Sequence, residues 1–173
     1  MSPRAAWRLE ALGFEQAYDY VGGKADWFAN GLPREGTSAA VPYAGELVDT
    51  NPPTCALNDA VADVRAALQG SRYGFCLAVN DRRIVLGRIR RSALDGAASA
   101  ATAESVMEPG PSTVRFDTPA HDLVQRLAAR DLKTAVVTTP GGCLVGVFDR
   151  ADAERRVAEA AAQESRSAPD TTD

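Results

Sequence analysis

The chain has 173 residues, of which 45% are hydrophobic and 24% charged, a composition typical of a soluble globular protein, and its formal net charge is −4 at pH 7. A chain of this length is long enough for one compact domain or for two small domains that share a core. The acidic balance argues against sequence-independent binding to nucleic acid or to an anionic membrane, because both require a basic protein surface.

The sequence shows no sign of export and no metal site. No apolar run approaches the roughly 20 residues of a membrane helix, and the first residues lack the apolar stretch of a secretory signal. The cysteines Cys55, Cys76 and Cys143 are an odd number, far apart and within apolar stretches, which predicts buried, reduced thiols in a cytoplasmic protein. His121 is the only histidine and no Cys-x-x-Cys pair occurs, so we predict that the protein binds no metal.

Residues 2–36 predict half of an α/β unit. An amphipathic helix is expected from Arg4 to Leu12, because a glycine, the residue favoured directly after a helix, follows it. A strand from Ala17 to Val21 and a second helix from Lys24 to Asn30 are expected next. Residues 37–53 contain three prolines and predict a linker.

The remainder of the chain contains two copies of one unit at an offset of 59 residues, the separation of Gly87 and Gly146. One unit alone leaves a sheet face uncovered, so we expect the two copies to pack together and share a core. The same offset, without a gap, also pairs Thr54 with Thr113, Asp63 with Asp122, Leu68 with Leu127, and Arg91 with Arg150.

Each copy predicts the order strand, helix, strand, strand, helix, and the fold class is therefore α+β. In the first copy, residues 54–94, the helices are expected at Asp59–Leu68 and Arg90–Leu94 and the hairpin strands at Phe75–Val79 and Ile84–Ile89. In the second copy, residues 113–163, the helices are expected at Pro119–Ala129 and from Arg150 to about Ala162, and the hairpin strands at Thr134–Thr138 and Cys143–Phe148. Residues 95–112 predict an inter-repeat linker, and the polar residues 164–173 predict a disordered tail.

The run from Val106 to Asp152, together with this order of elements, resembles a cystathionine-β-synthase (CBS) domain pair over about 100 of the 173 residues. The resemblance implies tandem βαββα repeats packed sheet against sheet, with two clefts that commonly bind adenine nucleotides or S-adenosylmethionine. It also implies a sensor that acts on an attached or partner protein and has neither catalytic residues nor a required cofactor.

In that family a motif Gly-apolar-x-Thr/Ser-x-x-Asp binds the ligand. Its Asp carboxylate binds the ribose hydroxyls, and its Thr or Ser hydroxyl contacts the phosphate. The second copy matches at Gly146 and Asp152 but has Asp149 at the hydroxyl position, where its charge repels phosphate. Arg150 beside it partly offsets that charge. The alternative interpretation is that Asp152 only stabilises the positive end of its helix dipole. The resemblance implies the binding residues Asp152, Asp149, Arg150, Gly146, Thr113 and Val114.

The first copy departs further from that motif. Its glycine, Gly87, is present, but Ala93 stands at the ribose position and supplies no carboxylate. Arg88, Arg90 and Arg91 either bind an anion or keep an exposed strand end soluble. We therefore expect at most one adenosine-type site, in the second copy.

Residues Arg4–Gly36 resemble the C-terminal third of a rhodanese (sulfurtransferase) domain, through the SPRAA helix start, the Val-Gly-Gly turn and the Trp27…Gly31-Leu32-Pro33 ending. The resemblance implies a cysteine nucleophile in the loop directly before the first helix. None of the three cysteines lies there, so we expect a truncated rhodanese-like remnant that does not transfer sulfur. It is either part of a longer rhodanese–CBS protein or a segment that packs against the CBS pair or another subunit.

Three functions remain open at this point. The first is a regulatory CBS pair that senses AMP, ADP, ATP or S-adenosylmethionine at the second repeat. The second is an interaction module that forms a homodimer or binds a protein partner and takes no nucleotide. The third is an accessory part of a rhodanese–CBS fusion. Asp149 and Asp152 lie on one helix face with no histidine near them in sequence, so we predict no acid–base catalysis and no enzyme.

Overall fold

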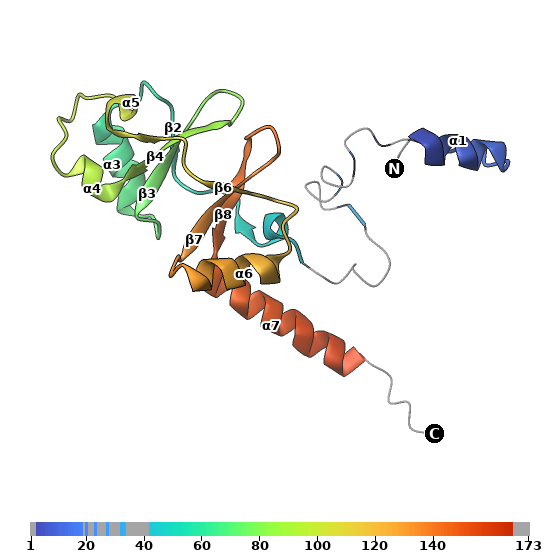
Figure 1. The fold of residues 1–173 in the computed structure, drawn as a ribbon. Helices are drawn as coiled ribbons and strands as arrows, with labels where there is room; N and C mark the ends of the chain where they lie inside the picture. Colours follow the sequence, from blue (N-terminus) through green and yellow to red (C-terminus); the bar gives the residue numbers. More distant parts are fainter. Residues whose placement is uncertain are drawn as a thin grey trace.

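The computed structural model describes residues 3–18, 20, 23, 27, 32–33 and 42–167, and the side chains of the last helix as far as residue 159. Two four-stranded sheets organise the described chain, one for each repeat (Figure 1). The strand orders are β2-β3-β4-β5 in the first sheet and β1-β8-β7-β6 in the second. The α+β fold of two paired repeats is therefore confirmed.

The first sheet consists of β2 (Thr54–Cys55), β3 (Phe75–Val79), β4 (Val85–Arg90) and β5 (Glu108–Pro109). Its helices are α3 (Val61–Gln69), α4 (Arg91–Leu94) and α5 (Ala103–Val106). β2 runs parallel to β3, and β3 and β4 form an antiparallel hairpin. The apolar face of α3 covers one side of this sheet, in a buried cluster that includes Val61, Val64, Leu68, Cys76 and Ile89.

The second sheet consists of β1 (Val48–Asp49), β8 (Leu144–Asp149), β7 (Thr134–Thr138) and β6 (Thr113–Arg115). It is covered by α6 (Ala120–Ala129) and the first turns of α7 (Arg150–Ser167), and a short 3-10 helix, η1 (Ala44–Glu46), precedes β1. α7 continues through residue 167, so the expected disordered tail is helical over its first residues, and 168–173 lie outside the described chain. The buried cluster under these helices includes Phe116, Leu123, Leu127, Val137 and Phe148.

The 59-residue offset holds in three dimensions. β3 and β7 begin and end at positions 59 apart, and so do β4 and β8. The hairpins even share an irregularity, because the register shifts between Ala78 and Val79 in one and between Val137 and Thr138 in the other. The predicted bounds of β3 and β7 are those observed, and the predicted bounds of β4 and β8 are off by one residue.

Two segments that we expected to be linkers carry structure. Residues 44–49 form η1 and β1, and β1 pairs antiparallel with β8. Residues 103–109 form α5 and β5, and β5 pairs antiparallel with β4. Two-residue strands leave no periodic signal in a sequence, so the linker interpretation was wrong for these stretches. Each repeat begins with a segment that completes the sheet of the other repeat.

Equivalent backbone hydrogen bonds hold both exchanged segments. The N–H of Ala44 donates to the carbonyl of Thr118, and the N–H of Ala103 donates to the carbonyl of Asp59, each at 2.8 Å. Ala44 and Ala103 are 59 residues apart, and so are the two acceptors, Asp59 and Thr118. The repeating unit therefore starts about ten residues earlier than the sequence pattern indicated.

The two motif glycines allow the exchanged strands to approach. A methyl group on Gly146 would overlap the carbonyl oxygen of Asp49 and lie 2.8 Å from a side-chain carbon of Val48. A methyl group on Gly87 would overlap the sulfur of Met107 and lie 3.2 Å from a backbone oxygen of β5. Both glycines thus have a packing role in this structure, whatever else the motif does.

The two sheets share a core, as expected. A third buried cluster lies between them and consists of Tyr73, Leu77, Val136, Leu144 and Val147. The tips of the two hairpins are also joined through their backbones. The N–H of Val85 donates to the carbonyl of Gly142 at 3.1 Å, and the N–H of Leu144 donates to the carbonyl of Arg83 at 2.8 Å.

The N-terminal segment is described only in part. The expected first helix is α1 (Pro3–Ala11), and Gly13 after it has a φ of 90°. Ala17, Tyr18 and Tyr20 are not in a strand, and the rest of the expected strand lies outside the described residues. The same holds for most of the expected second helix, although Trp27 is helical and donates its indole N–H to the carbonyl of Pro33 at 2.8 Å. The rhodanese-like resemblance stays a prediction.

The three cysteines are free thiols; Cys55 and Cys76 are buried and Cys143 is half-buried. The neighbouring Cys55 thiol and burial together raise the pKa of Cys76. Within the described residues no cluster of His, Cys, Asp and Glu is able to hold a metal ion. None of the helices in this part of the chain is long and apolar enough to cross a membrane.

Candidate ligand sites between the repeats

The expected binding residues of the second repeat fall into two groups. Asp149 ends β8 and Asp152 lies in the first turn of α7, so these two carboxylates are close together. Thr113 and Val114 belong to β6, and β7 separates that strand from β8. Arg150 forms an ion pair with Glu154, one turn further along α7, at 3.6 Å.

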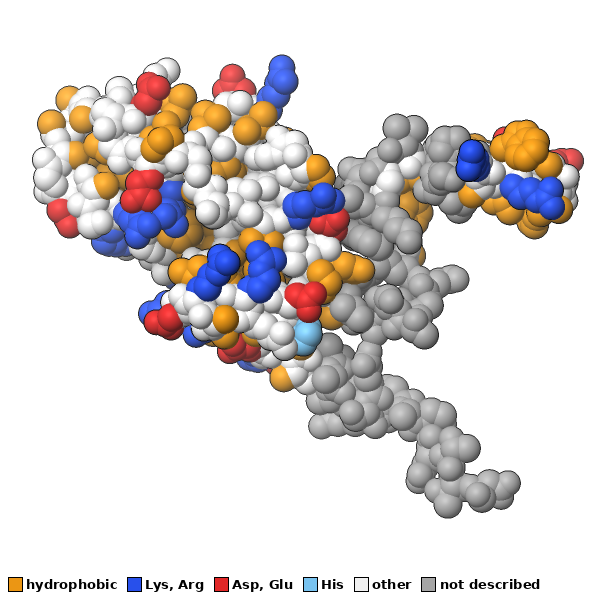
Figure 2. Space-filling model, viewed as in Figure 1, with side chains coloured by type: hydrophobic (Ala, Val, Ile, Leu, Met, Phe, Trp, Pro, Cys, Tyr) orange, Lys and Arg blue, Asp and Glu red, His pale blue; other side chains and the backbone are white. Residues whose placement is uncertain are grey.

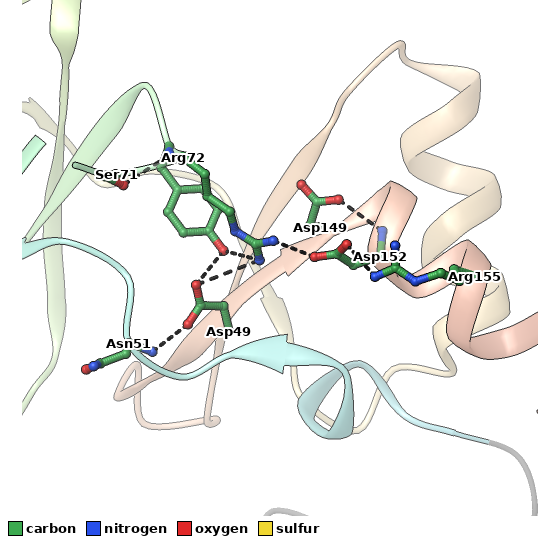
Figure 3. A network of polar contacts seen from close by, with 8 residues as sticks. Asp49, Asn51, Ser71, Arg72, Asp149, Asp152 and Arg155 are labelled. Carbon is green, nitrogen blue, oxygen red and sulfur yellow. Dashed lines mark hydrogen bonds and ion pairs between the residues drawn. The ribbon is translucent and has the colours of Figure 1, made fainter. Parts of the chain in front are cut away.

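Asp152 is the centre of a polar network that joins the two repeats (Figure 3). Arg72, from the loop between α3 and β3, donates a hydrogen bond of 2.5 Å to its Oδ2 atom. Arg155 donates to the Oδ1 atom at 3.0 Å. The backbone N–H of Asp152 in turn donates to the carboxylate of Asp149 at 3.1 Å, which caps the helix.

The other end of this network reaches β1. Arg72 donates to the Tyr73 hydroxyl at 2.8 Å, and that hydroxyl donates to Asp49 at 3.0 Å. The Nη2 atom of Arg72 also lies 3.7 Å from the Oδ2 atom of Asp49. We call the set Asp49, Arg72, Tyr73, Asp149, Asp152 and Arg155 the Arg72 network. Sequence reasoning missed Asp49, Arg72 and Tyr73, because Arg72 is 80 positions from its carboxylate partner and no motif marks it.

The electrostatics of the Arg72 network are well defined. The hydrogen bond from Arg72 lowers the pKa of the Asp152 carboxyl, so this group is ionised at neutral pH. Burial raises the pKa of Tyr73 to about 12, which keeps its hydroxyl protonated and able to donate to Asp49. The network therefore presents a fixed, partly exposed carboxylate at the junction of the repeats.

The first repeat has a pocket of about 240 Å³ at the equivalent place. The offset relates its Arg88 to Val147, its Arg90 to Asp149, and the nearby Ala93 to Asp152. The first repeat therefore carries a guanidinium group in place of Asp149, an alanine in place of Asp152, and a further guanidinium group in place of Val147. The pocket is lined by Gly74, Phe75, Arg88, Arg90, Arg91 and Ser92.

The three arginines of this pocket are held in different ways. Glu108 of β5 accepts from Arg88 at 3.0 Å and from the Nε atom of Arg90 at 2.9 Å. Arg91 donates to the carbonyl of Leu68 at 2.8 Å. The Nε atom of Arg88 is buried and has no hydrogen-bond partner. The hydrogen bond from Arg88, and to a smaller extent the one from Arg90, lowers the pKa of the Glu108 carboxyl, so that this carboxylate is ionised.

The surface outside these sites is mixed. Figure 2 shows the acidic and basic side chains of one face in small groups among hydrophobic ones, and the described residues on that face form no continuous basic area.

Comparison with known proteins agrees with the fold. Residues 103–159 match the family model of the CBS domain. No curated protein sequence matches the chain. Among solved structures, CBSX2 in complex with AMP is similar, with a TM-score of 0.58 and 17% identity over 68% of this chain and 97% of that one.

Two further structures extend this likeness. The CBS domain pair of protein MJ0100, in complex with 5′-methylthioadenosine and S-adenosyl-L-methionine, has a TM-score of 0.55 and 16% identity over 69% of this chain and 98% of that one. The cytosolic domain of the Mg²⁺ channel MgtE, in complex with ATP, has a TM-score of 0.58 and 21% identity over 66% of this chain. The chain spans about half of that structure, 48% of its length. At these identities the likeness shows the fold alone, which is that of a CBS domain pair.

Proposed function

We propose that this CBS pair is a non-catalytic, cytoplasmic regulatory module that binds an adenosine-type ligand beside Asp152. AMP, ADP, ATP and S-adenosylmethionine are the candidate ligands. The observation that carries the proposal is the placement of an ionised carboxylate, Asp152, at the junction of the repeats, one third exposed. The adenosine-type ligands named with the similar CBS structures support the choice of ligand class.

Asp152 retains the capacity to bind a ribose. An ionised carboxylate offers about four acceptor positions, and Arg72 and Arg155 use one on each oxygen. The remaining lone pairs are sufficient for both hydroxyls of a ribose. Hydrogen bonds to a charged group contribute roughly 1.5–3 kcal/mol each, more than neutral ones, so loss of this carboxylate is expected to weaken binding strongly.

The same network favours one alternative. Arg72 already ties Asp152 to the first repeat, so the carboxylate also acts as a structural link between the repeats. If that is its whole role, the protein is an interaction module that binds no nucleotide and acts through a homodimer or a protein partner. The two functions differ in how the protein responds to adenosine-type ligands.

The deciding experiment follows thermal unfolding of the full chain with AMP, ADP, ATP or S-adenosylmethionine. A ligand at 100 times its Kd stabilises the folded state by about 2.7 kcal/mol, which is readily visible as a rise in Tm. We expect one of the ligands to raise the Tm of the natural sequence and to lose this effect in Asp152→Asn. The matched control is Asp122→Asn, which removes a carboxylate from the first turn of α6 and should leave binding unchanged.

A second variant separates the two roles of Asp152. Arg72→Gln removes the link between the repeats but leaves the carboxylate in place, so ligand binding should persist in it. The proposal would be contradicted if none of the four ligands raised the Tm at millimolar concentration. It would also be contradicted if a ligand raised the Tm equally in Asp152→Asn and in the natural sequence. The interaction module would then be preferred, and the oligomeric state should be measured by sedimentation.

A further inference from the structure

The pocket of the first repeat differs in charge from the equivalent positions of the second repeat. Three arginines line it, and a single carboxylate, Glu108, accompanies them. Its Arg88 replaces a valine, Val147, that is fully buried in the second repeat. A guanidinium group at the edge of the core between the sheets is costly unless it is paired, so its presence calls for a negatively charged partner.

Glu108 satisfies that requirement only in part. It accepts from the Nη2 atom of Arg88, but the Nε atom of the same side chain is buried without a partner. Buried donors in folded proteins are almost always satisfied by protein, water or a bound ion. With three guanidinium groups and one carboxylate, the pocket also keeps an excess of about two positive charges. It is therefore suited to a dianion.

The volume of the pocket and the chemistry of its lining restrict the class of ligand further. The volume of about 240 Å³ lies below the roughly 300–1,000 Å³ of pockets that hold drug-sized ligands. Arginine is the side chain that best matches the geometry of phosphate oxygens, and the Ser92 hydroxyl adds a further donor to the lining. Ala93 supplies no carboxylate for a ribose.

We propose that this pocket binds a compact phosphoryl dianion through Arg88, Arg90 and Arg91, without recognising a nucleoside. A phosphoryl group carries a charge of about −1.5 to −2 at pH 7, which matches the excess of positive charge in the pocket. The source is free phosphate or pyrophosphate, or the phosphoryl end of a larger molecule. This site is distinct from the one beside Asp152.

The test is a titration of the full chain with sodium phosphate and with sodium pyrophosphate, followed by thermal unfolding and by ³¹P NMR line width. Sodium chloride keeps the ionic strength constant, and adenosine and AMP are tested in parallel. We expect a saturable rise in Tm and a broadened ³¹P signal with phosphate or pyrophosphate and no response to adenosine. Each lost arginine contact to a charged oxygen should weaken binding by about tenfold or more.

The variants are Arg88→Gln and, because Arg88 is only 30% exposed and its ion pair with Glu108 belongs to the fold, also the more exposed Arg90→Gln. Both should weaken the phosphate response, whereas Arg126→Gln on the exposed face of α6 changes the charge equally and should not. Asp152→Asn should also leave the phosphate response intact, which separates this site from the proposed nucleotide site.

Two results would overturn the inference. The first is a phosphate response that equals that of chloride at the same ionic strength, or that is unchanged in both pocket variants. The second is a response to AMP alone that both pocket variants abolish, because the arginines would then belong to a nucleotide site. A response to AMP that both variants weaken together with the phosphate response supports the site and identifies the phosphoryl end of a larger molecule as one source.

Discussion

At the scale of single residues, Arg72 and Tyr73 decide how the two repeats meet. The Arg72 and Asp152 side chains are 49% and 31% exposed, and ion pairs at such positions usually contribute only about 0–1 kcal/mol to stability. Tyr73, by contrast, is buried in the cluster between the sheets while its hydroxyl bonds to Asp49. Arg72 therefore orients a carboxylate, whereas Tyr73 contributes both packing and a buried hydrogen bond.

The raised pKa of Tyr73 predicts a loss of stability at alkaline pH. Burial raises the pKa of Tyr73 from its unfolded value near 10 to about 12 in the folded protein. The folded state therefore keeps a proton that the unfolded state has lost, so this group's contribution to the free energy of unfolding is complete below about pH 10 and declines from there to about pH 12. Urea denaturation between about pH 10 and pH 12 should show that the free energy of unfolding falls more steeply with pH for the natural sequence than for Tyr73→Phe.

The control for this prediction is Tyr18→Phe, since Tyr18 is 78% exposed. It should leave the alkaline decline unchanged. An identical decline in Tyr73→Phe and the natural sequence would show that the hydroxyl of Tyr73 ionises at its ordinary pH.

At the scale of elements, the exchange of β1 and β5 makes each sheet depend on the other repeat. β1 pairs with β8 and packs into the cluster around Phe148, while β5 and the residue before it lie against β4. Because Gly146 and Gly87 leave no side chain under these strands, the contacts are close and have little room to adjust.

Charged substitutions in the exchanged segments should each affect the distant repeat. Val48→Asp places a carboxylate against the cluster of the second repeat and should reduce amide hydrogen-exchange protection in β7 and β8 more than in β3 and β4. Met107→Asp should instead reduce protection in β3 and β4 more than in β7 and β8, since Met107 packs on the first repeat. Hydrogen exchange read by mass spectrometry measures both.

Thr50→Asp introduces the same charge at an exposed position beside β1 and should change little. If Val48→Asp reduced protection mainly in β3 and β4, the assignment of β1 to the second sheet would be wrong.

At the scale of the whole molecule, the cluster between the sheets couples the repeats into one folding unit. Leu77 is fully buried there against residues of the second repeat. Leu77→Ala should lower the free energy of unfolding by about 2–5 kcal/mol, the usual cost of such a cavity. Because the cluster contains residues of both repeats, we expect one urea unfolding transition, whose midpoint shifts to a lower urea concentration in Leu77→Ala.

Leu132→Ala is the matched control, because Leu132 is 46% exposed and its truncation should change stability by no more than about 0.5 kcal/mol. Two separate transitions in Leu77→Ala, one of them at the position of the natural sequence, would show that the repeats unfold independently.

Much of the fold was predictable because it depends on local patterns. The strands Phe75–Val79 and Thr134–Thr138 stand out as apolar runs between turn residues, and the 59-residue offset relates them. The candidate site was predictable only at Asp149 and Asp152, where a motif marks the start of a helix. The partners of Asp152 were not, since a contact between a loop and a helix 80 residues apart has no sequence period.

The amino-acid sequence by itself determined the repeated α+β unit, its helices and hairpins, and the loss of the motif carboxylate at Ala93. Only the tertiary structure decided that β1 and β5 cross between the repeats, that Arg72 binds Asp152, and that Arg88 and its neighbours surround a pocket. The physical reason is that hydrophobic period and turn chemistry act over a few residues. Strand pairing, ion pairs and pockets instead arise where two packed repeats bring distant residues together.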